Sequence, residues 1–134
     1  MGKNIKVYLF VMLFSFAACN SQRSLKVVWC EIDTVTDSER VISFHQLYTL
    51  KDLHRKTVTV EGFFSYSFED VALYPRPGSG GEGAWLSFKS RISDSLLRGL
   101  HGKKIAVTGE VDTTDKGHLN SCYCTIYNIS CIRE

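Results

Sequence analysis

The sequence predicts an all-β domain, built as a five-stranded OB-fold-like Greek-key barrel with one or two short helices. Short runs of alternating apolar and polar residues indicate strands, and Gly, Pro, Asp and Asn punctuate them. One run with helical spacing separates the third barrel strand from the fourth. The order strand, strand, strand, helix, strand, strand is that of the OB-fold, and a closed sheet has no exposed edges.

Two elements precede the barrel. Residues 25–32 form a first strand or an extended arm, and residues 33–40 are polar and turn-like. Ser43 begins a short helix, because its side chain can cap the first turn while Gln46 completes a capping box.

The first three barrel strands occupy residues 57–67, 71–74 and 84–88. Residues 57–67 alternate most clearly, and Gly62 inside this run indicates a bend. Glu69 and Asp70 are assigned to a solvated turn. The Pro, Gly and Ser content of residues 75–83 predicts a loop.

The second half of the barrel begins with a helix at residues 90–100, which Gly102 ends. Strands follow at residues 104–111 and 119–133, with a turn at 112–117 and a bulge near Asn128. The residues expected inside the barrel are Val58, Val60, Phe64, Leu86, Ile105, Val107 and Ile126.

The amino terminus has the pattern of an export signal. Lys3 and Lys6 precede an uncharged apolar run at residues 7–18, which is shorter than the ~20 residues needed to span a bilayer. Small residues then precede Cys19, as in the lipobox of bacterial lipoproteins, although Phe16 replaces the usual aliphatic residue. Ordinary cleavage after Ala17, giving a soluble secreted protein, and a buried structural segment are the alternatives.

The expected organisation therefore has three parts. Residues 1–18 are a lipoprotein signal peptide, residues 19–40 hold the lipidated Cys19, a tether and an amino-terminal arm, and residues 41–134 form the barrel domain. The expected location is the bacterial cell envelope, outside the cytoplasm, on the periplasmic or outer-membrane face.

Three segments together resemble an uncharacterised family of small bacterial OB-fold-like lipoproteins. They are residues 50–62, residues 68–74 with 84–86, and residues 102–109 with 116–118 and 126–129. The resemblance covers residues 41–132 and implies the fold. It implies no activity and no catalytic residues.

The charge balance argues against nucleic acid as a partner. The chain has 16 Lys and Arg against 14 Asp and Glu, and two of the positive charges, Lys3 and Lys6, lie in the export segment. The remainder is neutral, whereas nucleic-acid binding needs a basic surface.

Four cysteines remain when Cys19 carries lipid: Cys30, Cys122, Cys124 and Cys131. Outside the cytoplasm we expect disulfides, with a metal site or unpaired thiols as alternatives. A Cys122–Cys124 bond is disfavoured, because same-face neighbours on a strand lie near the reach limit of a bridge. We expect one bridge from Cys30 to the carboxy-terminal strand. Pairing all four would join Cys30 to Cys122 or Cys124, and Cys131 to the other.

Exposed aromatic side chains are the candidate binding residues, since alternation places about half of the aromatics in the core. The candidates are Tyr66, Tyr74, Trp85 and His118. No Gly-x-Ser-x-Gly elbow or recognisable carboxylate pair appears, so no catalytic residues, cofactor or metal are assigned.

These patterns predict a membrane-anchored, non-enzymatic binding or structural module. Its expected partners are the membrane, through the lipid on Cys19, and an envelope protein. A protein inhibitor of the toxin-neutralising type is the first alternative, and an enzyme is an alternative of a different class.

Overall fold

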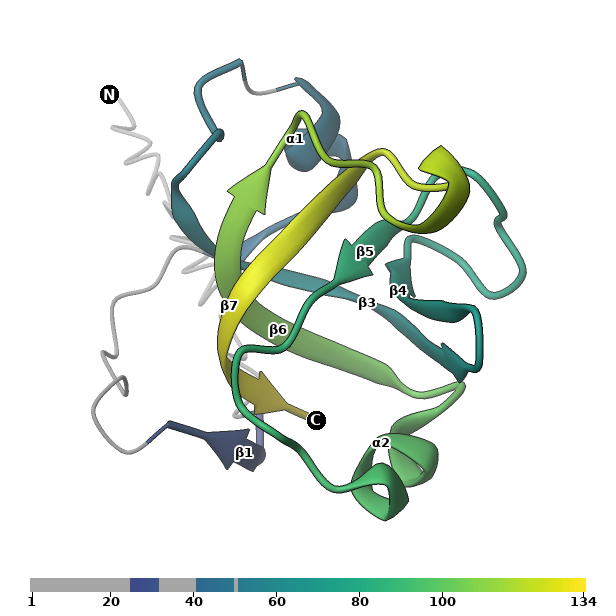
Figure 1. Ribbon diagram of the computed structural model, residues 1–134. Coiled ribbons are helices and arrows are strands. Elements are labelled where there is room, and N and C mark those ends of the chain that lie inside the picture. Colours follow the sequence, from purple (N-terminus) through teal and green to yellow (C-terminus); the bar gives the residue numbers. More distant parts are fainter. Residues whose placement is uncertain (1–24, 32–40, 50) are drawn as a thin grey trace, which may run out of the picture.

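The computed structural model describes residues 25–31, 41–49 and 51–134, and its centre is a closed barrel of five strands (Figure 1). Within the barrel each strand pairs with two of the other four, in the circular order β3, β4, β5, β7, β6 and back to β3. The five strands are β3 (Thr57–Ser67), β4 (Asp70–Tyr74), β5 (Ala84–Leu86), β6 (Lys104–Asp112) and β7 (Cys124–Arg133).

The pairing directions confirm the predicted OB-fold-like class. β5 and β7 run parallel, while the other four contacts around the barrel are antiparallel. The parallel pair requires a crossover, and the chain makes it through a helix between β5 and β6. This is the order of elements that the sequence predicts.

Two short strands continue the sheet beside the barrel. β1 (Val27–Cys30) pairs antiparallel with the last residues of β7, and β2 (Val41–Ile42) pairs parallel with the first half of β3. β3 therefore has β6 along one side, and β2 and β4 along the other. β7 likewise has β6 along one side, and β1 and β5 along the other. Residues 25–32 were expected to form a strand or an arm, and β1 is a strand.

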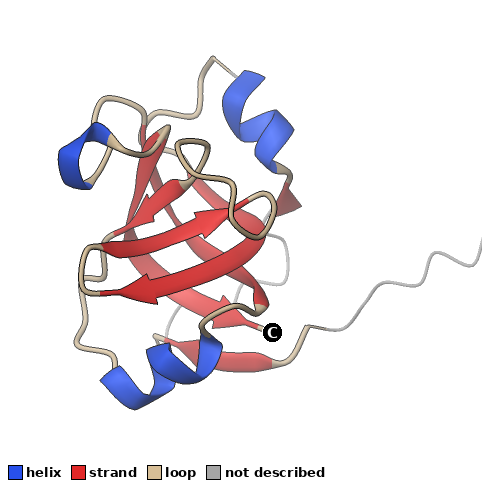
Figure 2. Cartoon of the chain, turned by 90° about the vertical axis from the view of Figure 1, so that its right-hand side faces the viewer, coloured by secondary structure: helices blue, strands red, loops and turns tan. Residues whose placement is uncertain are grey.

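Helices α1 (Phe44–Thr49) and α2 (Asp94–Leu100) lie outside the strands, at opposite ends of the barrel (Figure 2). The capping box of α1 forms as predicted. The Ser43 amide donates to Gln46 Oε1 at 2.9 Å, and the Gln46 amide donates to Ser43 Oγ at 3.3 Å. None of the described helices is long and apolar enough to cross a membrane.

The predicted core residues are all buried. Val60, Val107 and Ile126 have no exposed surface, and the other four are at most 5% exposed. Alternation along the strands determined this set, because successive side chains point to opposite faces of a sheet. The core thus follows directly from the sequence pattern.

The predicted bulge lies where β6 and β7 pair. Thr108 is opposite Cys131 and Glu110 is opposite Tyr127, so one residue of β6 faces three of β7. Asn128 adopts a positive φ of 47° within this bulge. On β6 the single residue is Gly109, and a Cβ there would lie 2.7 Å from the Ile126 side chain.

Several predicted boundaries are wrong. α2 begins at Asp94 rather than residue 90, because Ser93 is its N-cap and accepts from the Leu96 amide at 3.3 Å. β5 ends at Leu86 rather than residue 88. β7 begins at Cys124 rather than residue 119, because Leu119 and Asn120, with positive φ angles, belong to a short 3-10 turn at His118–Asn120.

A disulfide joins Cys30 of β1 to Cys131 of β7, which are direct cross-strand neighbours. The predicted bridge from Cys30 to the carboxy-terminal strand is confirmed. Pairing of all four cysteines is not found, since Cys122 and Cys124 are free and buried. The bulge inserts two extra residues into β7, which leaves the alternation unchanged, so Cys131 still faces away from Cys124.

Candidate binding site

The solvent-facing side of the β3–β4 hairpin carries a set of polar and aromatic residues. Phe63 is directly opposite Tyr74, and Ser65 is opposite Ala72. Asp70 and Tyr74 lie on the same face of β4 because they are an even number of residues apart. The barrel therefore presents Phe63, Ser65, Asp70 and Tyr74 together on its outer surface.

These residues line one side of a cleft of about 370 Å³. Residues 77–80 of the loop between β4 and β5 form another wall, and His101 and Gly102, directly after α2, form a third. The β3–β4 hairpin, a glycine-rich loop and the end of a helix thus enclose the cleft.

Asp70 is held in place by two hydroxyl groups. Ser65 Oγ donates to Asp70 Oδ2 at 2.5 Å, and the Tyr74 hydroxyl donates to Asp70 Oδ1 at 2.7 Å. Burial, followed by this hydrogen bond to Asp70, raises the pKa of Tyr74 well above its ordinary value. Tyr74 therefore stays protonated as a donor, and the carboxylate keeps one orientation.

His101 is the second polar group of the cleft. Its Nδ1 accepts a hydrogen bond from the Tyr66 amide at 3.0 Å. Because this contact occupies Nδ1 as an acceptor, Nε2 is the ring nitrogen that can donate. The cleft therefore contains an acceptor, Asp70, and a donor, His101, fixed on different elements.

The four predicted binding residues do not form one site. Tyr74 lines the cleft, whereas Tyr66 donates to Asp94 of α2 and lies beneath the Arg98 guanidinium. Trp85 and His118 lie together elsewhere, with ring centroids 6.3 Å apart. Only Tyr74 of the four belongs to the cleft.

The segment before β7 covers Trp85. OB-folds commonly bind ligands on the face of their second and third strands, which are β4 and β5 here. Gly117 lies so close to Trp85 that a Cβ there would be 2.5 Å from the ring. The Tyr123 amide donates to the Gly83 carbonyl at 2.8 Å and fixes the end of the same segment. The accessible site is therefore displaced toward the β3–β4 hairpin.

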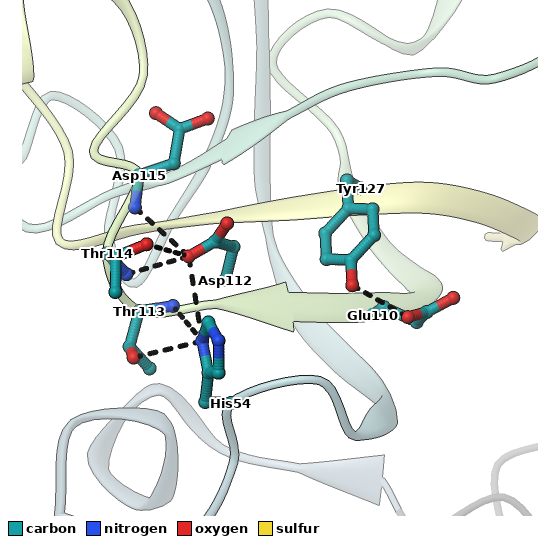
Figure 3. A network of polar contacts seen from close by, with 7 residues as sticks. All are labelled: His54, Glu110, Asp112, Thr113, Thr114, Asp115 and Tyr127. Atoms are coloured by element: carbon teal, nitrogen blue, oxygen red, sulfur yellow. Dashed lines mark hydrogen bonds and ion pairs between the residues drawn. The ribbon is translucent and has the colours of Figure 1, made fainter.

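A polar network fixes the start of that segment (Figure 3). Asp112 Oδ1 accepts from the amides of Thr114 at 2.8 Å and Asp115 at 3.1 Å, and from the Thr114 hydroxyl at 2.6 Å. His54 Nδ1 lies 3.6 Å from the same oxygen. The hydrogen bonds from Thr114 lower the pKa of Asp112, because they favour its charged form. These contacts stabilise the turn that follows β6, and we assign this network a structural role.

The free thiols of Cys122 and Cys124 are buried, and their pKa values are raised. Burial raises the pKa of Cys124 to about 12, and it also raises the pKa of Cys122. Neither side chain is more than 4% exposed. Within the described residues, no group of three or more His, Cys, Asp or Glu side chains is arranged to hold a metal ion.

The sequence pattern did not identify Asp70 and His101 as candidate binding residues. Asp70 was assigned to a solvated turn, but it begins β4 and its side chain enters the cleft. The spacing of Asp70 and Tyr74, on one face of a strand, was the available signal for the carboxylate. His101 had no local signal, since its role depends on the packing of α2 against β3.

No family model and no curated protein matches the sequence. Among solved structures, the chain is similar to a putative aspartyl-tRNA synthetase from Leishmania major Friedlin, with a TM-score of 0.50 and 11% identity. The match covers 82% of this chain and 23% of that one, so this chain spans less than a quarter of it. At this identity the likeness shows the fold alone.

Proposed function

We propose that the protein is a membrane-anchored, non-enzymatic binding module that holds its ligand in the cleft beside the β3–β4 hairpin. The cleft is the observation that carries the proposal. Its volume of about 370 Å³ falls within the roughly 300–1,000 Å³ usual for small-molecule sites, and it combines aromatic walls with few fixed polar groups.

Recognition suits the polar groups of the cleft better than catalysis does. Both carboxylate oxygens of Asp70 accept hydrogen bonds from the protein, and Nδ1 of His101 accepts from a backbone amide. Each group is thereby fixed as an acceptor or a donor. A catalytic nucleophile would instead need an adjacent base to activate it.

The proposed location in the bacterial envelope, and the lipid anchor at Cys19, rest on the sequence. The basic start, the apolar run at residues 7–18 and the small residues before Cys19 support it, and all lie outside the described residues. The Cys30–Cys131 disulfide also supports export, because disulfides persist in oxidising compartments. A diacylated cysteine anchors stably, since each buried methylene contributes about 0.8 kcal/mol.

Filling the cleft tests the binding proposal. Gly80 lines the cleft and Gly99 lies on α2, and a Cβ at either position would meet no atom within 4 Å. Gly80→Trp is therefore expected to occupy the cleft, and Gly99→Trp is the matched control. Both variants should fold, because the first side-chain atom at each position would point into open space.

The measurement is the amount of small molecule that copurifies with the full chain from its bacterial host, read by mass spectrometry of the extract. We expect a species retained by the wild type and by Gly99→Trp, but reduced about tenfold or more in Gly80→Trp, a change equivalent to ~1.4 kcal/mol. Equal retention by all three proteins would rule the cleft out as the binding site.

A second candidate function, a protein inhibitor, is favoured by two loop residues. Phe68 at the tip of the β3–β4 hairpin is 99% exposed, and Leu119 in the segment before β7 is 83% exposed. Protruding apolar side chains serve as anchors in protein interfaces. Under this alternative, Phe68→Ala with Leu119→Ala would abolish complex formation with the target, whereas Gly80→Trp would leave it intact.

A further inference from the structure

We infer that the cleft binds the ammonium group of a primary alkyl amine, with Asp70 as the counter-ion. This inference rests on the proposed function and names the ligand chemistry of the same site. A free alkyl amine and the side chain of a lysine in a partner protein share this chemistry.

The carboxylate of Asp70 has room for a cation. It accepts one hydrogen bond on each oxygen, from Ser65 and Tyr74, while an ionised carboxylate offers about four acceptor positions. No ion pair to Asp70 is found among residues 25–31, 41–49 and 51–134. The half-buried negative charge therefore has hydroxyl donors but no positive partner within the described protein.

Basic side chains adjacent to cleft residues are paired with other acids: Lys103 follows Gly102 in sequence, and Lys104 is opposite Phe63 on the neighbouring strand. Lys103 Nζ lies 2.8 Å from Glu134 Oε1, and Lys104 Nζ lies 2.9 Å from Glu61 Oε2. On the loop that walls the cleft, the Arg76 guanidinium lies 3.4 Å from Glu82 Oε2. These pairs leave the charge of Asp70 to be matched by a ligand.

The aromatic walls suit an alkylammonium ligand. Phe63 and Tyr74 are cross-strand neighbours that line the cleft on the same face as Asp70. A ring face attracts a cation, and the ring bodies remove the alkyl chain from water. Tyr74 strengthens this environment because it stays neutral while it donates to Asp70.

The same charge disfavours anionic ligands. Phosphates and carboxylates would approach Asp70 at close range without a fixed cation to offset the repulsion. His101 lines the same cleft, and its Nε2 is free of the contact to Tyr66 and can donate to a hydroxyl or carbonyl oxygen near the amine. The cleft thus matches an amine whose neighbouring atoms include an acceptor.

Three probes of matched length test the inference by NMR titration of the full chain: pentylammonium, pentanol and pentanoate. Pentylammonium should shift the amide signals of Ser65, Asp70 and Gly102. It should bind about tenfold or more tightly than pentanol, because hydrogen bonds between charged groups are stronger than those between a charged and a neutral group. Pentanoate should bind most weakly. Equal binding of the amine and the alcohol would overturn the inference.

Two variants separate Asp70 from general electrostatics. Asp70→Asn should reduce pentylammonium affinity about tenfold and leave pentanol binding unchanged, since the amide keeps the shape but loses the charge. Glu69→Gln removes the adjacent exposed charge outside the cleft and should change little. Equal losses in both variants would contradict a specific role for Asp70. The comparison of probes on the wild type remains decisive if Asp70→Asn fails to fold.

Nα-acetyl-lysine methylamide, which carries the ammonium on a lysine side chain, distinguishes a lysine of a partner protein from a free alkyl amine. Tighter binding of this probe than of pentylammonium indicates a lysine side chain, and weaker binding indicates a free amine. Shifts in the cleft with pentanol or pentanoate alone would defeat the amine inference while leaving the binding function intact. No cleft shift with any probe, together with equal retention by Gly80→Trp, would defeat both.

Discussion

Cys30 and Cys131 form a covalent link between the first and last described strands. They are 101 residues apart in sequence, so the bridge closes nearly the whole domain into a loop. Cross-linking so distant a pair restricts the unfolded chain strongly. At the scale of single residues, this bridge is expected to make a large contribution to the free energy of unfolding.

Replacing both cysteines, Cys30→Ser with Cys131→Ser, should lower the free energy of unfolding by about 2–5 kcal/mol. Chemical denaturation of the wild type and the variant measures the difference. Reductant should destabilise the wild type and leave the variant unaffected. A variant as stable as the oxidised wild type would show that the bridge does not stabilise the domain.

Cys122 and Cys124 should not react with a thiol reagent in the folded protein. Burial holds the pKa of Cys124 at about 12, so at pH 8 almost none of it is the reactive thiolate. Ellman's reagent should therefore modify these two residues only after denaturation. Rapid modification of either cysteine in the native state would contradict the burial described here.

At the scale of elements, the bulge between β6 and β7 depends on close backbone contact. A Cβ on Gly109 would lie 2.8 Å from the Tyr127 carbonyl oxygen as well as against Ile126. Because backbone cannot move aside as a flexible side chain can, the strands would have to separate locally.

Gly109→Ala should therefore cost about 1–3 kcal/mol of stability, as overpacking usually does. Gly99→Ala is the matched control, since its Cβ would meet open space on a helix and Ala favours helix over Gly by about 0.5–1 kcal/mol. The two variants should shift the thermal midpoint in opposite directions. A stabilising Gly109→Ala would show that the strands are less tightly paired.

The turn after β6 should be sensitive to acid. Hydrogen bonds lower the pKa of Asp112 in the folded state below its value in the unfolded chain. A carboxyl group of this kind stabilises the fold above its unfolded pKa, near 4, and that stabilisation is lost as the pH falls through the folded pKa. Asp112→Ala should therefore lower the thermal midpoint at pH 6 more than at pH 3. A difference that does not change with pH would contradict this role.

Alternation predicted the strands and the core because both depend on local sequence. Val60, Phe64 and Val107 were assigned to the interior from period-two spacing alone. The cleft could not be predicted in the same way. Asp70, Ser65 and His101 line one cleft because of the register of β3 with β4 and the position of α2. Neither of these can be read from the local sequence. The start of β7 was misplaced because Leu119 adopts a left-handed conformation that its residue type does not favour.

At the scale of the whole molecule, the disulfide connects β1 to the barrel. Cys30 follows the proposed lipid site, Cys19, by 11 residues in sequence. β1 and its bridge to β7 therefore fasten the chain close to its proposed anchor, and the cleft is built from other strands. The anchor and the binding site should be separable by mutation.

Membrane fractionation tests most directly whether a folded barrel is held at a membrane through Cys19. The wild type should sediment with membranes after a high-salt wash, and its mature amino terminus should be Cys19 carrying a diacylglycerol mass. Cys19→Ser should be released while keeping the disulfide and the thermal midpoint of the domain. A Cys19→Ser protein that stays with the washed membranes, or a wild type without lipid on Cys19, would contradict the anchored module.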